Sequence, residues 1–327
     1  MDFANRMDRL GTETAFEVLA KAKAIEAEGK NVIHLEIGEP DFDTPPHVIE
    51  AARTALLNGR THYTPAAGIP ELRDAIVRNV KALRGVDVDP SQVVVTPGAK
   101  PIMYFVITAL VNPGDEVIYP NPGFPIYESV IEFVGGKAVP LPLKEERGFS
   151  FDVADLQARV TDKTKLIIIN TPANPTGGIL EKSDIEAIAE IARTRRIPVL
   201  TDEVYKNIIY DGDHVSIMAE PGMEDLTILL DGFSKTYAMT GWRLGFGVMP
   251  EALAKHVERL MVNSNSCTAT FIQDAGVQAL DGRQEEADAM VEAFRERRKV
   301  IVDGLNALPG VSCIMPKGAF YVFPNVC

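Results

Sequence analysis

The sequence predicts an α/β protein with a mostly parallel sheet that is flanked by helices. Three observations predict this class. Segments with helically spaced apolar residues alternate with short runs of β-branched or apolar residues. Some runs, such as 166–169, are apolar throughout, which is typical of strands buried on both faces. The length of 327 residues predicts two domains, or one large domain with an appendage.

The predicted helices carry apolar residues three or four positions apart. In chain order they span Glu13–Glu28, His47–Asn58, Pro70–Leu83, Ile102–Val111, Ile126–Val134, Glu181–Arg193, Glu251–Val262, Phe271–Leu280 and Gln284–Leu308. Proline marks the start of two of them, at Pro46 and Pro70, and glycine marks two ends, at Gly59 and Gly85.

The predicted strands lie between these helices and are short. They span Gln92–Thr96, Glu116–Tyr119, Ala138–Leu143, Lys165–Asn170, Pro198–Asp202, Leu226–Asp231, Trp242–Val248, Val311–Ile314 and Phe320–Phe323. In open α/β sheets ligands bind at the carboxyl ends of the strands. Gly98, Asn174, Asp202 and Lys235 each end or follow a predicted strand, so we expect them to converge on one ligand.

Composition excludes several classes of protein. Hydrophobic residues make up 46% of the chain and charged residues 24%, as in globular proteins, and no apolar run is long enough to cross a bilayer. The net charge of -13 opposes binding to nucleic acid or anionic lipid. Three widely spaced cysteines and a charged N-terminal segment predict a reduced, cytoplasmic protein. The histidines lack metal-ligand spacing, and no strand is followed by the nicotinamide-binding Gly-x-Gly-x-x-Gly, so neither ligand is predicted.

The most informative stretch is Gly232-Phe-Ser-Lys-Thr-Tyr-Ala-Met-Thr-Gly-Trp-Arg-Leu-Gly245. It places Lys235 on a turn after a strand and Arg243 eight residues later. The pKa of lysine falls readily on desolvation, which suits Schiff-base chemistry, and a nearby arginine can fix a phosphate. The stretch resembles, position for position, the lysine signature of the class I aminotransferases of fold type I, which use pyridoxal 5'-phosphate (PLP).

Two further motifs fit this resemblance. In Thr96-Pro-Gly-Ala-Lys-Pro101 a glycine precedes a helix start, which is a ready anion site. The resemblance implies that Gly98, Ala99 and Lys100 bind the cofactor phosphate together with Arg243, and that Ser234 is an additional donor. In the loop 121–129 an aromatic side chain can stack on the cofactor ring, with Phe124 the first candidate and Tyr127 the second.

The resemblance also assigns the groups around the cofactor ring. In Thr171-Pro-Ala-Asn-Pro-Thr-Gly-Gly178, Asn174 is expected to donate to the cofactor's 3-oxygen and to contact substrate, and the Asn174–Pro175 bond is predicted to be cis. Asp202 is expected to stabilise the protonated pyridine nitrogen, with Glu203 the competing carboxylate. Tyr205 is expected to bind the 3-oxygen opposite Asn174.

Two N-terminal segments match as well. Leu35-Glu-Ile-Gly-Glu-Pro-Asp-Phe-Asp-Thr-Pro45 resembles the segment in which a glycine, here Gly38, approaches the substrate carboxylate. His62-Tyr-Thr-Pro-Ala-Ala-Gly-Ile-Pro-Glu-Leu-Arg73 resembles the segment whose tyrosine, here Tyr63, reaches the phosphate of the neighbouring subunit. The resemblance therefore implies a homodimer.

The match runs from Gly11 to Asn325 and implies the PLP-transferase fold of type I. We expect a large domain over 46–282 with a seven-stranded sheet. An N-terminal arm with part of a small α+β domain is expected over 1–45, and the incomplete remainder of that domain over 283–327. The implied reaction moves an amino group between an L-amino acid and a 2-oxo acid by a ping-pong mechanism. Lys235 is the implied Schiff-base lysine and proton shuttle, and Asp202 and Tyr205 complete the catalytic set.

The C-terminal end departs from the family pattern. Family members continue for several tens of residues, and that segment carries the arginine that binds the substrate α-carboxylate. No arginine here falls in the matching motif, so weak activity and an aggregation-prone sheet edge are expected of the chain as given. The alternatives are a PLP-dependent lyase, acting by C–S β-elimination or α,γ-elimination, and a non-catalytic relative. The preferred amino acid stays open, with the loop 263–270 expected to influence it.

Overall fold

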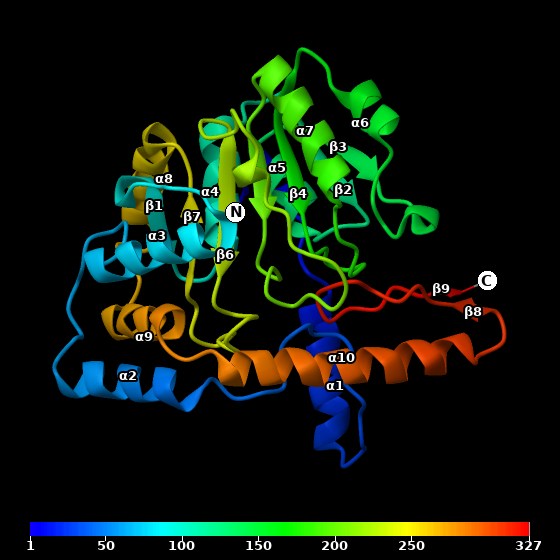
Figure 1. Cartoon of the computed structure of the whole chain (residues 1–327), viewed down its shortest axis with the longest axis horizontal. Helices are drawn as coiled ribbons and strands as arrows, with labels where there is room; N and C mark the ends of the chain where they lie inside the picture. Colours follow the sequence, from blue (N-terminus) through cyan, green and yellow to red (C-terminus); the bar gives the residue numbers. More distant parts are fainter. Residues whose placement is uncertain (327) are drawn as a thin grey trace.

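The structure is a computed structural model that describes residues 1–326, so that Cys327 lies outside the described residues (Figure 1). Within these residues a seven-stranded sheet has the order β1-β7-β6-β5-β4-β2-β3. The strands are β1 (Val93–Thr96), β2 (Glu116–Asn121), β3 (Lys137–Pro142), β4 (Thr164–Asn170), β5 (Val199–Asp202), β6 (Thr227–Gly232) and β7 (Gly245–Val248). β7 runs antiparallel to β1 and β6, whereas the other neighbouring pairs are parallel. The prediction of a mostly parallel sheet is confirmed.

Every predicted helix is present, with bounds shifted by a few residues. The helices are α1 (Ala15–Ala27), α2 (Pro46–Leu57), α3 (Pro70–Arg84), α4 (Lys100–Leu110), α5 (Ile126–Phe133), α6 (Val153–Arg159), α7 (Lys182–Arg195), α8 (Glu251–Ser264), α9 (Thr270–Asp281) and α10 (Glu285–Asn306). Short 3-10 helices span Asn5–Arg9, Pro90–Gln92, Glu145–Arg147 and Ile217–Ala219. Prolines start α2 and α3 as expected, and Gly85 ends α3 in the left-handed conformation at φ 71°.

Two predicted strands are wrong and one helix was missed. α6 was not predicted, because its seven residues are too short for a clear apolar period, although the Asp152 side chain caps it by accepting from the Ala154 amide. The strand expected over 242–248 begins only at Gly245, since Arg243 adopts a positive φ of 56° that no strand allows. The segment 320–323 forms no strand. Instead β8 (Val311–Ser312) pairs with β9 (Asn325–Val326), and Phe320 packs its ring on other aromatic rings.

The sheet is buried on both faces, as the continuous apolar runs predict. Successive residues of β4 alternate between two clusters: Leu166 and Ile168 pack with α4, α5 and α8, whereas Ile167 and Ile169 pack with α7. A third cluster joins β1, β6 and β7 to α2, α3 and α9. The sheet is therefore a rigid platform for the loops at its strand ends.

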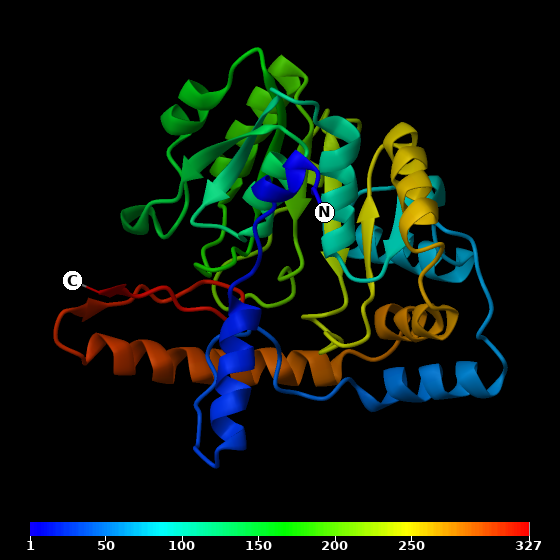
Figure 2. The ribbon, with the colours of Figure 1, turned by 180° about the vertical axis from the view of Figure 1, so that it is seen from behind.

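α1, α10 and the C-terminal segment lie beyond those strand ends, whereas the 3-10 helix Asn5–Arg9 packs against α5. α10 crosses below the sheet, and the C-terminal segment returns alongside it, while α1 projects past α10 in both views (Figures 1 and 2). The division of the chain at residues 45 and 282 stays a prediction. None of the helices within the described residues is long and apolar enough to cross a membrane.

Candidate active site

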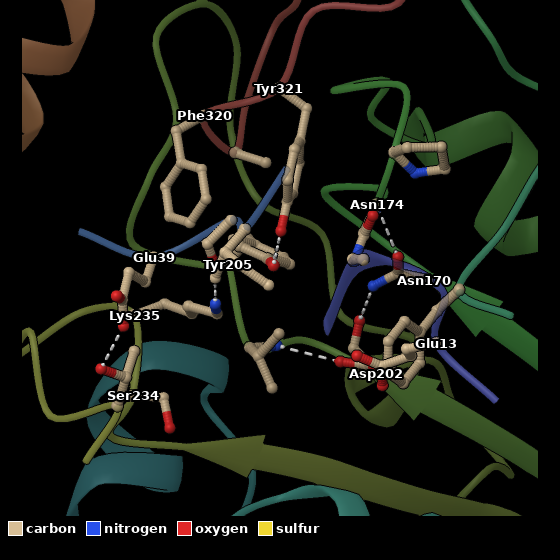
Figure 3. A pocket seen from close by; sticks show the side chains of 18 of the residues that line it. Glu13, Glu39, Asn170, Asn174, Asp202, Tyr205, Ser234, Lys235, Phe320 and Tyr321 are labelled. Atoms are coloured by element: carbon tan, nitrogen blue, oxygen red, sulfur yellow. Dashed lines mark hydrogen bonds between the residues drawn. The ribbon is translucent and has the colours of Figure 1, made fainter. Parts of the chain in front are cut away.

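A cavity of about 1120 Å³ lies at the carboxyl ends of the strands, under the C-terminal segment (Figure 3). Most of the residues predicted to bind cofactor or substrate line it. They are Gly38, Ala99, Lys100, Phe124, Asn174, Asp202, Tyr205, Ser234, Lys235 and Arg243. Of the predicted set, Gly98 lies just behind the wall and Tyr63 lies away from the cavity, with its side chain 88% exposed. The expected convergence of four strand-end loops is thus seen in the geometry.

Lys235 is held as a half-buried amine by the turn after β6. Its Nζ donates to the Gly38 carbonyl oxygen and lies 5.8 Å from the ring centre of Tyr205 and 5.3 Å from that of Phe320. Burial is the main cause that lowers the pKa of Lys235 to about 8; the charge of Glu39 opposes this shift and that of Arg243 adds to it. A substantial fraction of this amine is therefore neutral near physiological pH and can act as a nucleophile or base.

Asp202 presents a buried carboxylate at the end of β5. The Tyr127 hydroxyl donates to its Oδ2 at 2.6 Å, and the Val204 amide donates to its Oδ1 at 3.3 Å. Burial raises the pKa of Asp202 to about 6, although both hydrogen bonds lower it. No cation is paired with this carboxylate among the described residues. Such a group favours binding of a cationic N–H, as a protonated pyridine would offer.

Glu203, the competing carboxylate, does not line the cavity and is hydrogen-bonded to other side chains. It accepts from Arg84 Nε at 2.8 Å and from His214 Nε2 at 2.8 Å, on the side of the sheet away from the cavity. Burial alone would raise the pKa of Glu203, but the charges of Arg84 and His214 outweigh burial and hold the pKa well below its ordinary value. Arg84 also binds Asp231 at 2.9 Å, as does Lys206 at 2.8 Å. Because adjacent strand residues face opposite sides, only one of these carboxylates can reach the cavity.

Gly98 and Arg243 form a cradle for an anion. A Cβ on Gly98 would lie only 2.2 Å from Arg243 Nη2, so the guanidinium rests directly against the glycine backbone, whose φ is +91°. Arg243 Nη1 donates to the Thr240 carbonyl oxygen at 2.7 Å, which fixes the orientation of the guanidinium group. Next to it, a Cβ on Gly245 would lie 2.3 Å from the Ala99 nitrogen, so β7 packs tightly on the start of α4. Free amides at a helix start beside a fixed guanidinium fit a phosphate group.

Lys100 and Phe124 also line the cavity. The Lys100 ammonium pairs with Glu13 and lies 5.3 Å from the Phe124 ring centre. The Lys100 side chain is thus already neutralised, which leaves its backbone amide to face an anion. Between the two aromatic candidates for stacking, Tyr127 is fully buried and its hydroxyl is used on Asp202, whereas Phe124 stays partly exposed in the cavity wall.

Sequence reasoning missed two polar residues that shape the cavity. Asn170, at the end of β4, accepts the Asn174 amide at 2.7 Å and donates to the Asp202 carbonyl oxygen at 3.0 Å (Figure 3). Its position beside Asp202 at a strand end was the signal available. Tyr321 pairs its hydroxyl with that of Tyr205 at 2.5 Å, and no local motif marks it. The predicted cis bond between Asn174 and Pro175 is confirmed.

Comparison with known proteins gives a consistent result. Residues 30–327 match the family model for aminotransferase class I and II. The aspartate aminotransferase of Musicola paradisiaca is 40% identical over 99% of this chain and 81% of its own length, and that of Pyrococcus abyssi is 42% identical over 98% and 82%. Aspartate aminotransferase from Thermus thermophilus with maleate superposes with a TM-score of 0.95 at 36% identity, covering 99% of this chain and 85% of that one. The chain therefore belongs to the class I and II aminotransferases, of fold type I.

Proposed function

We propose that this aminotransferase binds PLP in the cavity and uses it to move an amino group between an L-amino acid and a 2-oxo acid. One observation carries the proposal: a half-buried amine with a lowered pKa, Lys235, shares a cavity with a buried carboxylate that has no cationic partner, Asp202. The family match supports the reaction class, and the relatives of this fold use PLP.

The residues present fit the cofactor group by group. Asp202 would bind the ring nitrogen and Phe124 the ring face, while Asn174 and Tyr205 would bind the 3-oxygen. The phosphate would be held by Ala99, Lys100, Ser234 and Arg243, which line the cavity, and by Gly98, which lies against Arg243. When bound, the cofactor supplies an electron sink for the charge that develops at the substrate α-carbon.

Lys235 has the properties of a proton carrier. Its pKa of about 8 lies near working pH, so Nζ can both accept and release a proton without a large free-energy penalty. The Gly38 carbonyl oxygen, which accepts from Nζ, keeps the amine at the cavity wall. Gly38 and Asn174 lie on the side where we place the substrate carboxylate.

Two arginines on α10 also line the cavity but are engaged with acidic partners. Arg297 pairs with Asp41 at 2.6 Å, and Arg298 pairs with Asp211 at 2.5 Å. Neither is proposed as the clamp for the α-carboxylate. The expectation that this clamp belongs to a segment beyond the match stays a prediction.

We also propose a homodimer in which Tyr63 contributes to the partner's phosphate site. Tyr63 is exposed and does not line its own cavity, and the nearby loop 263–270, expected to affect selectivity, does not line that cavity either. The Thr270 hydroxyl ties this loop to the His62 carbonyl oxygen at 2.6 Å, so both segments would reach a second copy together. Light scattering would give the oligomeric state.

The spaced cysteines support a cytoplasmic location.

The test is a PLP titration followed by visible absorbance and product analysis. Protein loaded with PLP is mixed with single L-amino acids from a panel that covers aspartate, aromatic residues and alanine. We expect a protein-bound band that particular amino acids bleach, with release of the matching 2-oxo acid. Lys235→Ala is the control and should lack the band. Ammonia release without an acceptor acid would indicate the lyase alternative, and a protein that never acquires the band would refute the proposal.

A further inference from the structure

The C-terminal segment places a second tyrosine against the tyrosine of the proposed cofactor site. The hydroxyl oxygens of Tyr205 and Tyr321 lie 2.5 Å apart, and their ring centres lie 5.6 Å apart at 78° (Figure 3). Tyr321 lines the same cavity as Lys235. The pair joins two segments that are 116 positions apart in the chain.

The surrounding backbone holds Tyr321 in this position. The Ala319 amide donates to the Ile208 carbonyl oxygen at 2.9 Å, and the Gly318 amide donates to the Gly177 carbonyl oxygen at 3.0 Å. The Tyr210 hydroxyl also holds this segment, since it donates to the Ala319 carbonyl oxygen. The segment is thus tied to the loops that follow β4 and β5.

The site is also shaped to admit the Tyr321 hydroxyl. A Cβ on Gly38 would lie 2.5 Å from Tyr321 Oη, so only glycine leaves room for that oxygen. The Gly38 carbonyl oxygen in turn accepts from Lys235. The tyrosine pair and the lysine therefore meet around one small residue.

Both hydroxyls keep their protons at neutral pH. Burial raises the pKa of Tyr321 to about 12 and raises that of Tyr205 well above its ordinary value. The other titratable groups that act on the pair are Asp202, Tyr127, Glu13 and Lys235. In a pair of protonated hydroxyls one must donate and the other accept, and the acceptor's own proton is then free for a third partner.

We propose that Tyr321 is a positioning residue whose hydroxyl donates to Tyr205 and thereby directs the Tyr205 proton to the 3-oxygen of the cofactor. This inference rests on the proposed function. Tyr205 is the member of the pair that we assign to the 3-oxygen, so it is the one whose proton must be free. A hydroxyl that accepts a hydrogen bond also becomes a stronger donor, because hydrogen bonds in a chain polarise one another.

The test is a pH titration of the visible absorbance of the PLP-loaded protein, in wild type and in Tyr321→Phe. The quantity compared is the pH at the midpoint of the absorbance change. Phenylalanine keeps the ring packing and removes only the hydroxyl. A weaker Tyr205 donor stabilises negative charge on the 3-oxygen less, so the proton at the Lys235 nitrogen is held more tightly. We expect the midpoint to rise by roughly half a pH unit. The corresponding free energy is smaller than the contribution of one neutral hydrogen bond.

A double-mutant cycle separates this role from a structural one. Tyr205→Phe should raise the midpoint by itself, and adding Tyr321→Phe to it should change the midpoint no further. Tyr210→Phe is the matched control, because the Tyr210 hydroxyl holds the same segment but does not hydrogen-bond to Tyr205. This variant should lower the stability of the protein and leave the midpoint unchanged. An unchanged midpoint in Tyr321→Phe, or an equal shift in the Tyr205→Phe background, would overturn the inference. A wild-type protein that shows no band would instead refute the proposed function.

Discussion

Asp202→Asn should stabilise the cofactor-free protein while weakening its binding of PLP. The carboxylate is buried, receives hydrogen bonds from Tyr127 and Val204, and has a pKa raised to about 6 by burial. Asparagine has nearly the same shape and can accept from the Val204 amide with its oxygen, while its amide group donates to the Tyr127 hydroxyl. The substitution therefore removes a buried charge and leaves the packing in place.

The size of the effect follows from the shift in pKa. The pKa of Asp202 rises from 3.8 to about 6, or roughly 2 units, and each unit is worth about 1.4 kcal/mol, so the charged form costs about 3 kcal/mol of stability. Because the folded-state pKa lies above the unfolded one, this cost is absent below about pH 4 and complete above about pH 6. The gain from Asp202→Asn should follow the same pH window.

Thermal unfolding of cofactor-free protein at pH 4.5 and pH 7.5 measures this difference. We expect Asp202→Asn to unfold several degrees above wild type at pH 7.5 and to keep only about a third of this difference at pH 4.5, where most Asp202 carboxyls of the folded protein are protonated. The same variant should bind PLP at least tenfold more weakly at pH 7.5. An Asp202→Asn protein that is less stable than wild type at pH 7.5 would show that the carboxylate is compensated in the fold, contrary to our reasoning.

Three further predictions concern the cradle, the buried ion network and the lysine. Gly98→Ala should weaken PLP binding at least tenfold, because the new Cβ would meet Arg243. Gly59 has a similar positive φ but open space around it, so the control Gly59→Ala should leave the affinity for PLP unchanged. Fluorescence titration with PLP measures both affinities. Arg84→Met should lower the free energy of unfolding, measured with denaturant, by about 3–5 kcal/mol, because buried Glu203 and Asp231 each lose a partner. The control Arg78→Met removes an exposed ion pair and should lower it by at most about 1 kcal/mol. Equal losses in the two variants would contradict the role assigned to the buried network. The rate of PLP association should rise with pH and level off above about pH 8, as the Lys235 amine loses its proton, and a flat stopped-flow profile would contradict the assignment.

The sheet was predictable because its signals are local. Continuous apolar runs such as 166–169 mark strands covered on both faces, and the structure places alternate residues of β4 in two separate clusters. The strand-end positions of Asn174, Asp202 and Lys235 then followed from the topology of open sheets. Their convergence needed no knowledge of distant contacts.

The parts that sequence reasoning missed depend on long-range packing. Tyr321 meets Tyr205 only because the chain returns from α10, and the strand predicted over 320–323 failed because aromatic packing against Phe294 and Tyr205 replaced strand pairing. Arg84 reaches Glu203 across 119 positions. Local pattern carries no information on such partners.

Reductive trapping tests the central claim most directly. The PLP-loaded protein is treated with borohydride, digested, and examined by peptide mass spectrometry. Our interpretation predicts one pyridoxyl group per chain, on the peptide that contains Lys235, and none at that position in Lys235→Ala. A label spread over exposed lysines, or a protein that carries no label, would contradict the assignment of this cavity as the cofactor site.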